Sequence, residues 1–263
     1  FVLLTSLVYS VIGTGYKALS WAFISQNNRY VDTTTPLGTG GIGHALLGTI
    51  EIVLVCTVIA VPLGIAVAVY LTQSRAKHLG VIRTLIQALS GLPSVVSGLF
   101  ILSIIVMFHL QTSGFMGALA LFPLMLPTVA RVAEESLKLV PHDLRLGALA
   151  LGAPNYKAFF TVILPAAKTG IITAVLLGVA RIIGETAPLV LTTTVASTTN
   201  ANIFSGGIST LPTYIFSYLQ SAYASSQLRA WGAALVLIIL VAILFVSVRV
   251  IARTKSNKPS KGK

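Results

Sequence analysis

The sequence predicts an all-α, polytopic membrane protein with six transmembrane helices. The first observation is composition: 55% of the 263 residues are hydrophobic and 9% are charged, whereas soluble domains carry about 25% charged residues. The second observation is that long apolar runs recur along the chain. A helix needs about 20 predominantly apolar residues to cross a bilayer, and these runs reach that length.

Six apolar runs are the candidate spans. They cover 1–19, 45–71, 83–110, 114–132, 166–193 and 229–251. Several contain Gly or Pro, which membrane helices tolerate because neighbouring helices satisfy the freed backbone groups. No fixed-period repeat or polar domain interrupts the pattern, so we expect a single transmembrane domain over 1–263. The first residue is Phe1 rather than Met, and we expect a further segment upstream of it.

Basic residues predict the orientation of these spans. Most of the net charge of +12 comes from 75–83, 131–168 and the C-terminal tail. The loops on the other side carry few basic residues: Lys17, Arg29 and Arg229. Since cytoplasmic loops are enriched in Lys and Arg, both termini and the basic tail, 252–263, are predicted to be cytoplasmic. The same placement argues against nucleic acid as a partner and for membrane lipid.

Several kinds of chemistry are not expected within this chain. Cys56 is the only cysteine, so neither an internal disulfide nor a cysteine-based metal site is expected. Residues 38–43 match the letters G-x-G-x-x-G, but they follow a polar loop rather than a strand. No G-x-x-x-x-G-K-[ST] motif is present. We therefore expect no cofactor or metal here; if ATP drives the protein, another chain binds it.

The longest predicted cytoplasmic segment is 134–165. Pro141 is suited to the start of a short helix and Gly152 to its end. Pro154 opens a second short helix, and Leu164-Pro165 marks a further break. One interpretation is a pair of helices lying at the membrane interface. The other is a docking element for a cytoplasmic partner.

The loop then shows a resemblance to a known family. Ala148, Gly152 and Leu164-Pro165 are in register with E-A-A-x-x-x-G-x9-I-x-L-P, the coupling-loop signature of ABC-importer permeases. The first two letters differ, because Leu146 and Gly147 replace Glu and Ala. The resemblance implies that Gly152, with its neighbours Ala153 and Pro154, couples to an ATPase. Three nearby polar residues are candidates to replace the missing Glu: His142, Asp143 and Arg145.

Two further stretches narrow the resemblance. "GLPSVVSGLF" at 91–100 and "ARIIGETAPL" at 180–189 are similar to segments of phosphate ABC-transporter permeases of the PstA type. That family implies a MetI-like fold in the bacterial inner membrane. It implies a PstC-type permease partner, two PstB-type ATP-binding subunits that hold ATP and magnesium, and an external PstS-type phosphate-binding protein. The chain itself would not be an enzyme.

Polar residues on the third span form a candidate pathway. Gln87, Ser90, Ser94 and Ser97 follow one another at spacings of three, four and three, which predicts a single face if the helix is continuous. Such a stripe is consistent with hydroxyl-mediated helix packing. It is equally consistent with a solvated, donor-lined path.

Arg181 and Glu185 are the strongest site candidates. They stand four residues apart in an almost wholly apolar run, which predicts that they share one face of a continuous helix. In such a helix they lie about 22 and 28 Å from its cytoplasmic start. Each charge at mid-membrane costs about 2.5–3.5 kcal/mol, so both are expected to face the bundle interior. The pair is interpreted either as a structural ion pair or as an anion site, in which the guanidinium binds phosphate and the carboxylate moderates affinity.

Other function classes are also compatible with this pattern. An ion- or proton-coupled anion transporter would use Glu185 as its relay, but it would not need the loop signature. An ABC permease for another substrate would keep that signature. A membrane scaffold or sensor would leave the two charges of the fifth span unexplained.

Overall fold

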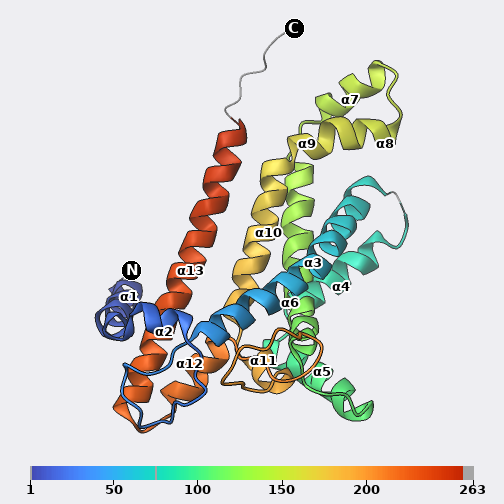
Figure 1. The fold of residues 1–263 in the computed structure, drawn as a ribbon. Helices are drawn as coiled ribbons and strands as arrows, with labels where there is room; N and C mark the ends of the chain where they lie inside the picture. Colours follow the sequence, from blue (N-terminus) through green and yellow to red (C-terminus); the bar gives the residue numbers. More distant parts are fainter. Residues whose placement is uncertain (1, 75, 257–263) are drawn as a thin grey trace. The chain divides into compact units, whose positions relative to one another are not determined.

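The structure, a computed structural model, describes residues 2–74 and 76–256, with the side chains at 4 and over 248–256 left out. The described residues form helices and connecting loops (Figure 1). The α-helices are α1 Val2–Gly15, α2 Trp21–Ser25, α3 Gly43–Gln73, α4 Leu79–Ser90, α5 Ser94–Met107, α6 Gly114–Lys138, α7 His142–Ala150, α8 Asn155–Ala158, α9 Leu164–Ala166, α10 Lys168–Ile183, α11 Ala187–Thr192, α12 Leu211–Leu219 and α13 Ala224–Ser256. A 3₁₀ turn, η1, covers Tyr16–Ala18, and a π-helical segment, η2, covers Phe159–Ile163.

Three described helices are long and apolar enough to cross a membrane by themselves. They are α3, α6 and α13 up to Ser247. Two bent pairs pass the same criterion together, α4 with α5 and Asn155–Ala166 with Lys168–Ile183, which raises the number to 5. The predicted first span is not a single long helix here, because α1 ends at Gly15 and a short 3₁₀ turn follows. The chain is a multi-pass membrane protein, and six spans stay a prediction.

The third predicted span is broken. α4 ends at Ser90, Gly91 forms its C-cap, and Pro93 is the N-cap of α5 with extended backbone angles (φ −60°, ψ 133°). A residue before proline is pushed away from helical angles, so the helix does not continue through Leu92. In contrast, Pro62 lies inside α3, and Pro123 and Pro127 lie inside α6.

Residue contacts divide the chain into two compact units. Unit 1 contains Phe1–Cys56, Pro93–Phe122 and Ile182–Ile243; unit 2 contains Thr57–Leu92, Pro123–Arg181 and Leu244–Lys263. Each unit is described below by itself. The predicted single domain over 1–263 stays a prediction, and most of the predicted tail, 252–263, lies outside the described residues.

In unit 1, the core forms where η1, α2 and the start of α3 meet α12 and α13 (Figure 1). Phe23 and Leu211 are fully buried there, and Tyr214 is nearly so. Close approach depends on small residues: a Cβ on Gly15 would stand 2.6 Å from the Trp231 carbonyl oxygen. Short contacts of this kind are typical of helices packed in a membrane.

In unit 2, α6 and α10 are packed antiparallel through small residues. A Cβ added to Gly170 would meet Ser136, and one added to Gly178 would meet Val129 and Met125. The core beside them contains Ala133 of α6, Ala174 of α10, Ala167 just before α10, and Phe159 of η2. Unit 2 therefore joins α6 and α10 to the segment that links these two helices.

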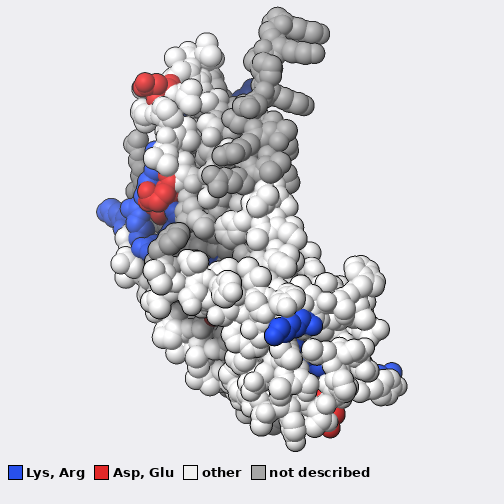
Figure 2. All heavy atoms as spheres, turned by 90° about the vertical axis from the view of Figure 1, so that its left-hand side faces the viewer, with Lys and Arg blue, Asp and Glu red and all other residues white. Residues whose placement is uncertain are grey.

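The outer surface carries many large apolar side chains. Leu54, Val58, Phe100 and Ile243 are each more than half exposed on their helices. On the face shown in Figure 2, uncharged residues cover most of the surface and charged ones gather in a few groups. In a bilayer this surface faces lipid tails or other helices, which explains why the chain presents it.

Candidate functional site

The helix carrying Arg181 ends before Glu185. Arg181 is an exposed residue in the last turn of α10, which ends at Ile183, whereas Glu185 is half-buried in the break before α11. The backbone N–H of Glu185 donates to the Ile182 carbonyl at 3.2 Å. The prediction that both residues share one face of a continuous helix is therefore wrong. Gly184 and the proline at the start of α11, Pro188, disfavour continuation of α10.

The polar stripe of the third span is also divided. Gln87 and Ser90 lie on α4, and Ser94 and Ser97 lie on α5, so they do not form one face of one helix. The break at 91–93 is the reason.

The four polar residues have different surroundings. The Ser90 hydroxyl donates to the Ile86 carbonyl within its own helix at 2.9 Å. The Ser97 hydroxyl is buried and donates to the Ala120 carbonyl of α6, which is a packing contact. Gln87 and Ser90 are exposed and Ser94 is half-buried. Of these three described side chains, Gln87 and Ser94 make no hydrogen bond, whereas Ser90 is already bonded to its own helix.

Two short helices stand on either side of Gly152, as predicted. The N–H of Gly152 donates to the Leu149 carbonyl at 2.9 Å, and that of Ala153 donates to the Ala148 carbonyl at 3.1 Å. This pair of bonds is a Schellman motif, whose C′ residue adopts the left-handed conformation; Gly152 has φ +81°. Pro154 then caps α8 with extended backbone. The turn needs glycine because of its backbone angle.

A polar contact holds the two arms of this turn together. Nη2 of Arg145, on α7, donates to Oδ1 of Asn155, on α8, at 3.3 Å. Of the three residues proposed to replace the missing Glu of the loop signature, Arg145 thus makes a bond across the turn. Leu146, at the position of that Glu, is 51% exposed.

The second half of the loop is anchored in unit 2. Ala158, Phe159 and Ile163 are buried, and the latter two pack in the core that contains Ala68 of α3 and Ala133 of α6. Leu164 and Pro165 form α9 at the foot of α10, with Leu164 half-buried and Pro165 exposed. α8 is therefore continuous with a packed segment that contacts α3 and α6.

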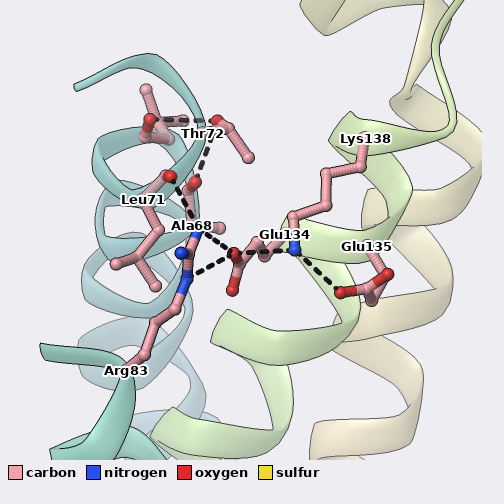
Figure 3. Close-up of polar contacts among 8 residues, drawn as sticks. Ala68, Leu71, Thr72, Arg83, Glu134, Glu135 and Lys138 are labelled. Atoms are coloured by element: carbon pink, nitrogen blue, oxygen red, sulfur yellow. Dashed lines mark hydrogen bonds and ion pairs between the residues drawn. The ribbon is translucent and has the colours of Figure 1, made fainter. Parts of the chain in front are cut away.

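A charge cluster lies at one end of α6 and was not predicted from the sequence. The Glu134 side chain is 9% exposed, and its Oε1 accepts bonds from Arg83 Nε at 3.2 Å and Nη2 at 3.1 Å and lies 3.0 Å from Lys138 Nζ. Arg83 also donates to the Leu71 carbonyl at 3.3 Å, and Lys138 contacts Glu135 at 3.1 Å (Figure 3). Arg83 therefore ties α3, α4 and α6 together. A signal was available, because Glu134 and Lys138 are four residues apart on a helix.

Two neighbouring cavities adjoin this cluster in unit 2. One, of about 480 Å³, is lined by residues that include Arg83, Gln87, Arg131 and Glu134. The other, of about 470 Å³, reaches His142 and Arg145 of the loop. Both are lined by Leu71, Arg83 and Lys138, so the charge cluster stands between them.

Arg229 of α13 was predicted only as an outer-loop charge, but its side chain is fully buried. Its Nη2 donates to the carbonyls of Pro36 and Thr39 at 2.7 Å each. The neighbouring Ser225 and Ser226 hydroxyls donate to the Thr33 carbonyl at 3.0 and 2.8 Å. The first turns of α13 thereby hold the loop over 33–39. Sequence alone gave no signal for this, because the acceptors are backbone carbonyls.

Comparison with known proteins agrees with this fold. The chain matches the family model described as "binding-protein-dependent transport system inner membrane component" over residues 60–257. Two solved structures are similar at 19% identity, which shows a shared fold. One is an amino acid ABC transporter, with TM-score 0.63 over 80% of this chain and 92% of that chain. The other is the MetNI methionine ABC transporter in an inward-facing form, with TM-score 0.62 over 81% and 94%.

Curated relatives are more similar in sequence. The "phosphate transport system permease protein PstA 1" of Mycobacterium tuberculosis is 42% identical over 207 residues, 78% of this chain and 67% of the relative. PstA of Yersinia pestis is 35% identical over 255 residues, 95% of this chain and 84% of the relative. The chain therefore belongs to the binding-protein-dependent transport system inner membrane components, and within that family to the PstA-type permeases.

Proposed function

We propose that this chain is the membrane-spanning permease subunit of an ATP-driven phosphate importer in the bacterial inner membrane. The observation that carries the proposal is the extent of its likeness to proteins named phosphate transport permeases. The Yersinia pestis relative matches 95% of this chain, so the similarity includes the spans, the loop and the Arg181 region together. As a transport component, the chain is not itself an enzyme.

The importer contains other subunits. We assign a PstC-type permease as the second membrane subunit, a PstB-type dimer as the ATPase and a PstS-type protein as the external phosphate-binding protein. ATP and magnesium belong to the PstB-type subunit, and this chain holds no cofactor. The distribution of basic residues supports cytoplasmic N- and C-termini.

The helix pair α7–α8 is the ATPase-coupling element in this proposal. Leu146, Leu151 and Tyr156 are 51, 90 and 69% exposed on it, and an apolar face of this kind is suited to a groove on a partner. The Schellman turn at Gly152 and the Arg145–Asn155 bond make the pair a defined shape. Because η2 is packed against α3 and α6, a push on α7–α8 moves the spans.

Arg181 is the anion-facing group of the pathway. It is exposed on α10, and facing lipid would be unfavourable for a guanidinium. A guanidinium offers planar paired donors to phosphate oxygens. Glu185 follows Arg181 by four residues and places a negative charge in the same stretch. This charge repels phosphate and thereby favours its release. Ser94 and Gln87 are accessible donors that would line the remaining path.

The test is ATP-dependent uptake of radiolabelled phosphate into liposomes. The liposomes carry this permease, the PstC-type permease and the PstB-type ATPase, and the PstS-type binding protein is supplied with them. We expect uptake with this subunit present and none when it is omitted, and sulfate or methionine should not replace phosphate. Uptake of phosphate that is independent of ATP, or equal transport of methionine, would overturn the proposal.

A further inference from the structure

The cavity beside the charge cluster contains a cation that the cluster does not use. Among the described residues, Arg83 and Lys138 are engaged by Glu134, but Arg131 makes no ion pair or hydrogen bond, and it lines the same cavity. Gln87, from the predicted stripe, also lines it. The proposed pathway so far assigns no role to Arg131.

Arg131 is too deep to be a surface charge at the end of the helix. It lies seven residues before Lys138 on α6, which is about 10 Å further into the membrane at 1.5 Å per residue. Its side chain is exposed in this chain. A guanidinium at such a depth is unfavourable against lipid tails and is favourable against a hydrated cavity or an anion.

The register of α6 and α10 places Arg131 on the inward side of Arg181. Gly170 faces Ser136 and Gly178 faces Val129 across the helix pair. Extended to the next turns, this antiparallel register sets Arg131 near residue 175. Arg181 is then about 9 Å nearer the outside, so an anion that leaves Arg181 inward next meets the level of Arg131.

The charges of the cavity favour weak anion binding. Three cations, Arg83, Arg131 and Lys138, face two carboxylates, Glu134 and Glu135, which leaves an excess of one positive charge. An entering anion is attracted to Arg131 but competes with Glu134 for the other two cations. Such a site binds and releases, as a step in a transport path requires.

We propose that this cavity is a second binding site for a phosphate oxyanion, with Arg131 as its anchor and the Gln87 amide as a further donor. Glu134 limits the affinity by holding Arg83 and Lys138. The inference rests on the proposed function when the oxyanion is the transported phosphate. The phosphate group of an inner-leaflet lipid has the same chemistry, and the experiment separates the two sources.

The experiment uses the assembled importer without ATP, in nanodiscs of the phosphate-free lipid digalactosyldiacylglycerol. A cysteine at Val132, which lines the cavity, is modified by a charged thiol reagent with and without inorganic phosphate. Cys56 is fully buried, and it is replaced by Ala or, if that variant does not assemble, left in place. Chloride at equal ionic strength and a cysteine at the exposed Thr173 are the controls.

We expect phosphate to slow modification at position 132 severalfold and to leave position 173 unchanged. Arg131→Gln should abolish this protection. Lys168→Gln, which removes an exposed charge of the same unit outside the cavity, should preserve it. Protection that appears only when phosphatidylglycerol replaces the galactolipid supports the site and identifies the lipid headgroup as its occupant.

Absence of protection in both lipids, or protection that survives Arg131→Gln, would overturn the inference. ATP-dependent uptake is measured on the same preparations. Normal uptake without protection refutes this site alone, whereas protection without any uptake refutes the proposed function and leaves the site.

Discussion

Replacing Glu134 with Gln removes one charge from the most buried carboxylate of the charge cluster and preserves its size. Oε1 of Glu134 lies 3.1 Å from Arg83 Nη2 and 3.0 Å from Lys138 Nζ, so Arg83 loses its counter-charge and Lys138 keeps only that of Glu135. Breaking a fully buried ion pair costs about 3–5 kcal/mol, and an exposed pair contributes about 0–1 kcal/mol. The two cationic side chains are 50 and 46% exposed. Because water screens them, we expect Glu134→Gln to lower the free energy of unfolding by about 1–3 kcal/mol.

Glu135→Gln is the matched control, since it is the same change one residue along. The Glu135 side chain is 68% exposed and contacts only Lys138 within the cluster, at 3.1 Å, so its loss should be below about 1 kcal/mol. Thermal unfolding of the purified complex at low and high salt compares the two. The Glu134 effect should persist at high salt, because buried pairs are screened less. Equal losses for the two variants, or a Glu134 effect abolished by salt, would refute the reasoning.

Three further predictions concern other parts of the chain. A Cβ on Gly147 or on Gly152 meets no atom within 4 Å, but only Gly152 has a positive φ, +81°. Gly152→Ala should therefore lower the free energy of unfolding by about 1–2 kcal/mol and weaken co-purification with the ATPase, whereas Gly147→Ala should do neither. Equal effects of the two substitutions would contradict this prediction. Arg229→Met should expose the 33–39 loop to external protease, whereas Arg29→Met, at an exposed position, should leave cleavage unchanged; equal cleavage of both variants would count against the loop contact. Ser97→Ala should lower the free energy of unfolding by about 1 kcal/mol and leave phosphate uptake normal. Ser94→Leu should block phosphate uptake and leave the free energy of unfolding unchanged. Normal uptake by Ser94→Leu would exclude Ser94 from the path.

Local signals predicted the loop correctly. Pro141, Gly152 and Pro154 each restrict the backbone in a way that depends on adjacent residues only, so the two short helices and their turn could be located from sequence. The long apolar helices α3, α6 and α13 were predictable for a similar reason, since hydrophobic length alone decides whether a helix crosses the bilayer.

Breaks within apolar runs were harder to predict. Pro62, Pro123 and Pro127 lie inside helices, whereas Pro93 ends one segment and starts another. The same residue type has opposite outcomes, because the tertiary surroundings decide whether the freed carbonyls are satisfied. The division of the predicted third span into α4 and α5, and the end of α10 before Glu185, are two such breaks.

Contacts between distant segments were not predictable from a single sequence. Arg83 and Glu134 are 51 residues apart, and each alone resembles an ordinary interfacial charge. Arg229 is bound by carbonyls of the 35–39 segment, which leave no mark in the side-chain pattern. Sequence patterns record local geometry, whereas these contacts depend on which helices pack together.

In the proposed mechanism phosphate passes Arg181, and phosphate transport by charge variants of this residue tests that role. Uptake by the reconstituted complex should fall in the order wild type, Arg181→Lys, Arg181→Gln, because Lys keeps the charge but loses the planar donors. Glu185→Gln should slow turnover by prolonging phosphate retention. In each case the complex should still assemble. The decisive variant combines Arg181→Gln with Glu185→Gln. We expect phosphate uptake to stay lost in this double variant. Recovery of both assembly and uptake would contradict the pathway role and show that the two residues form a purely structural pair.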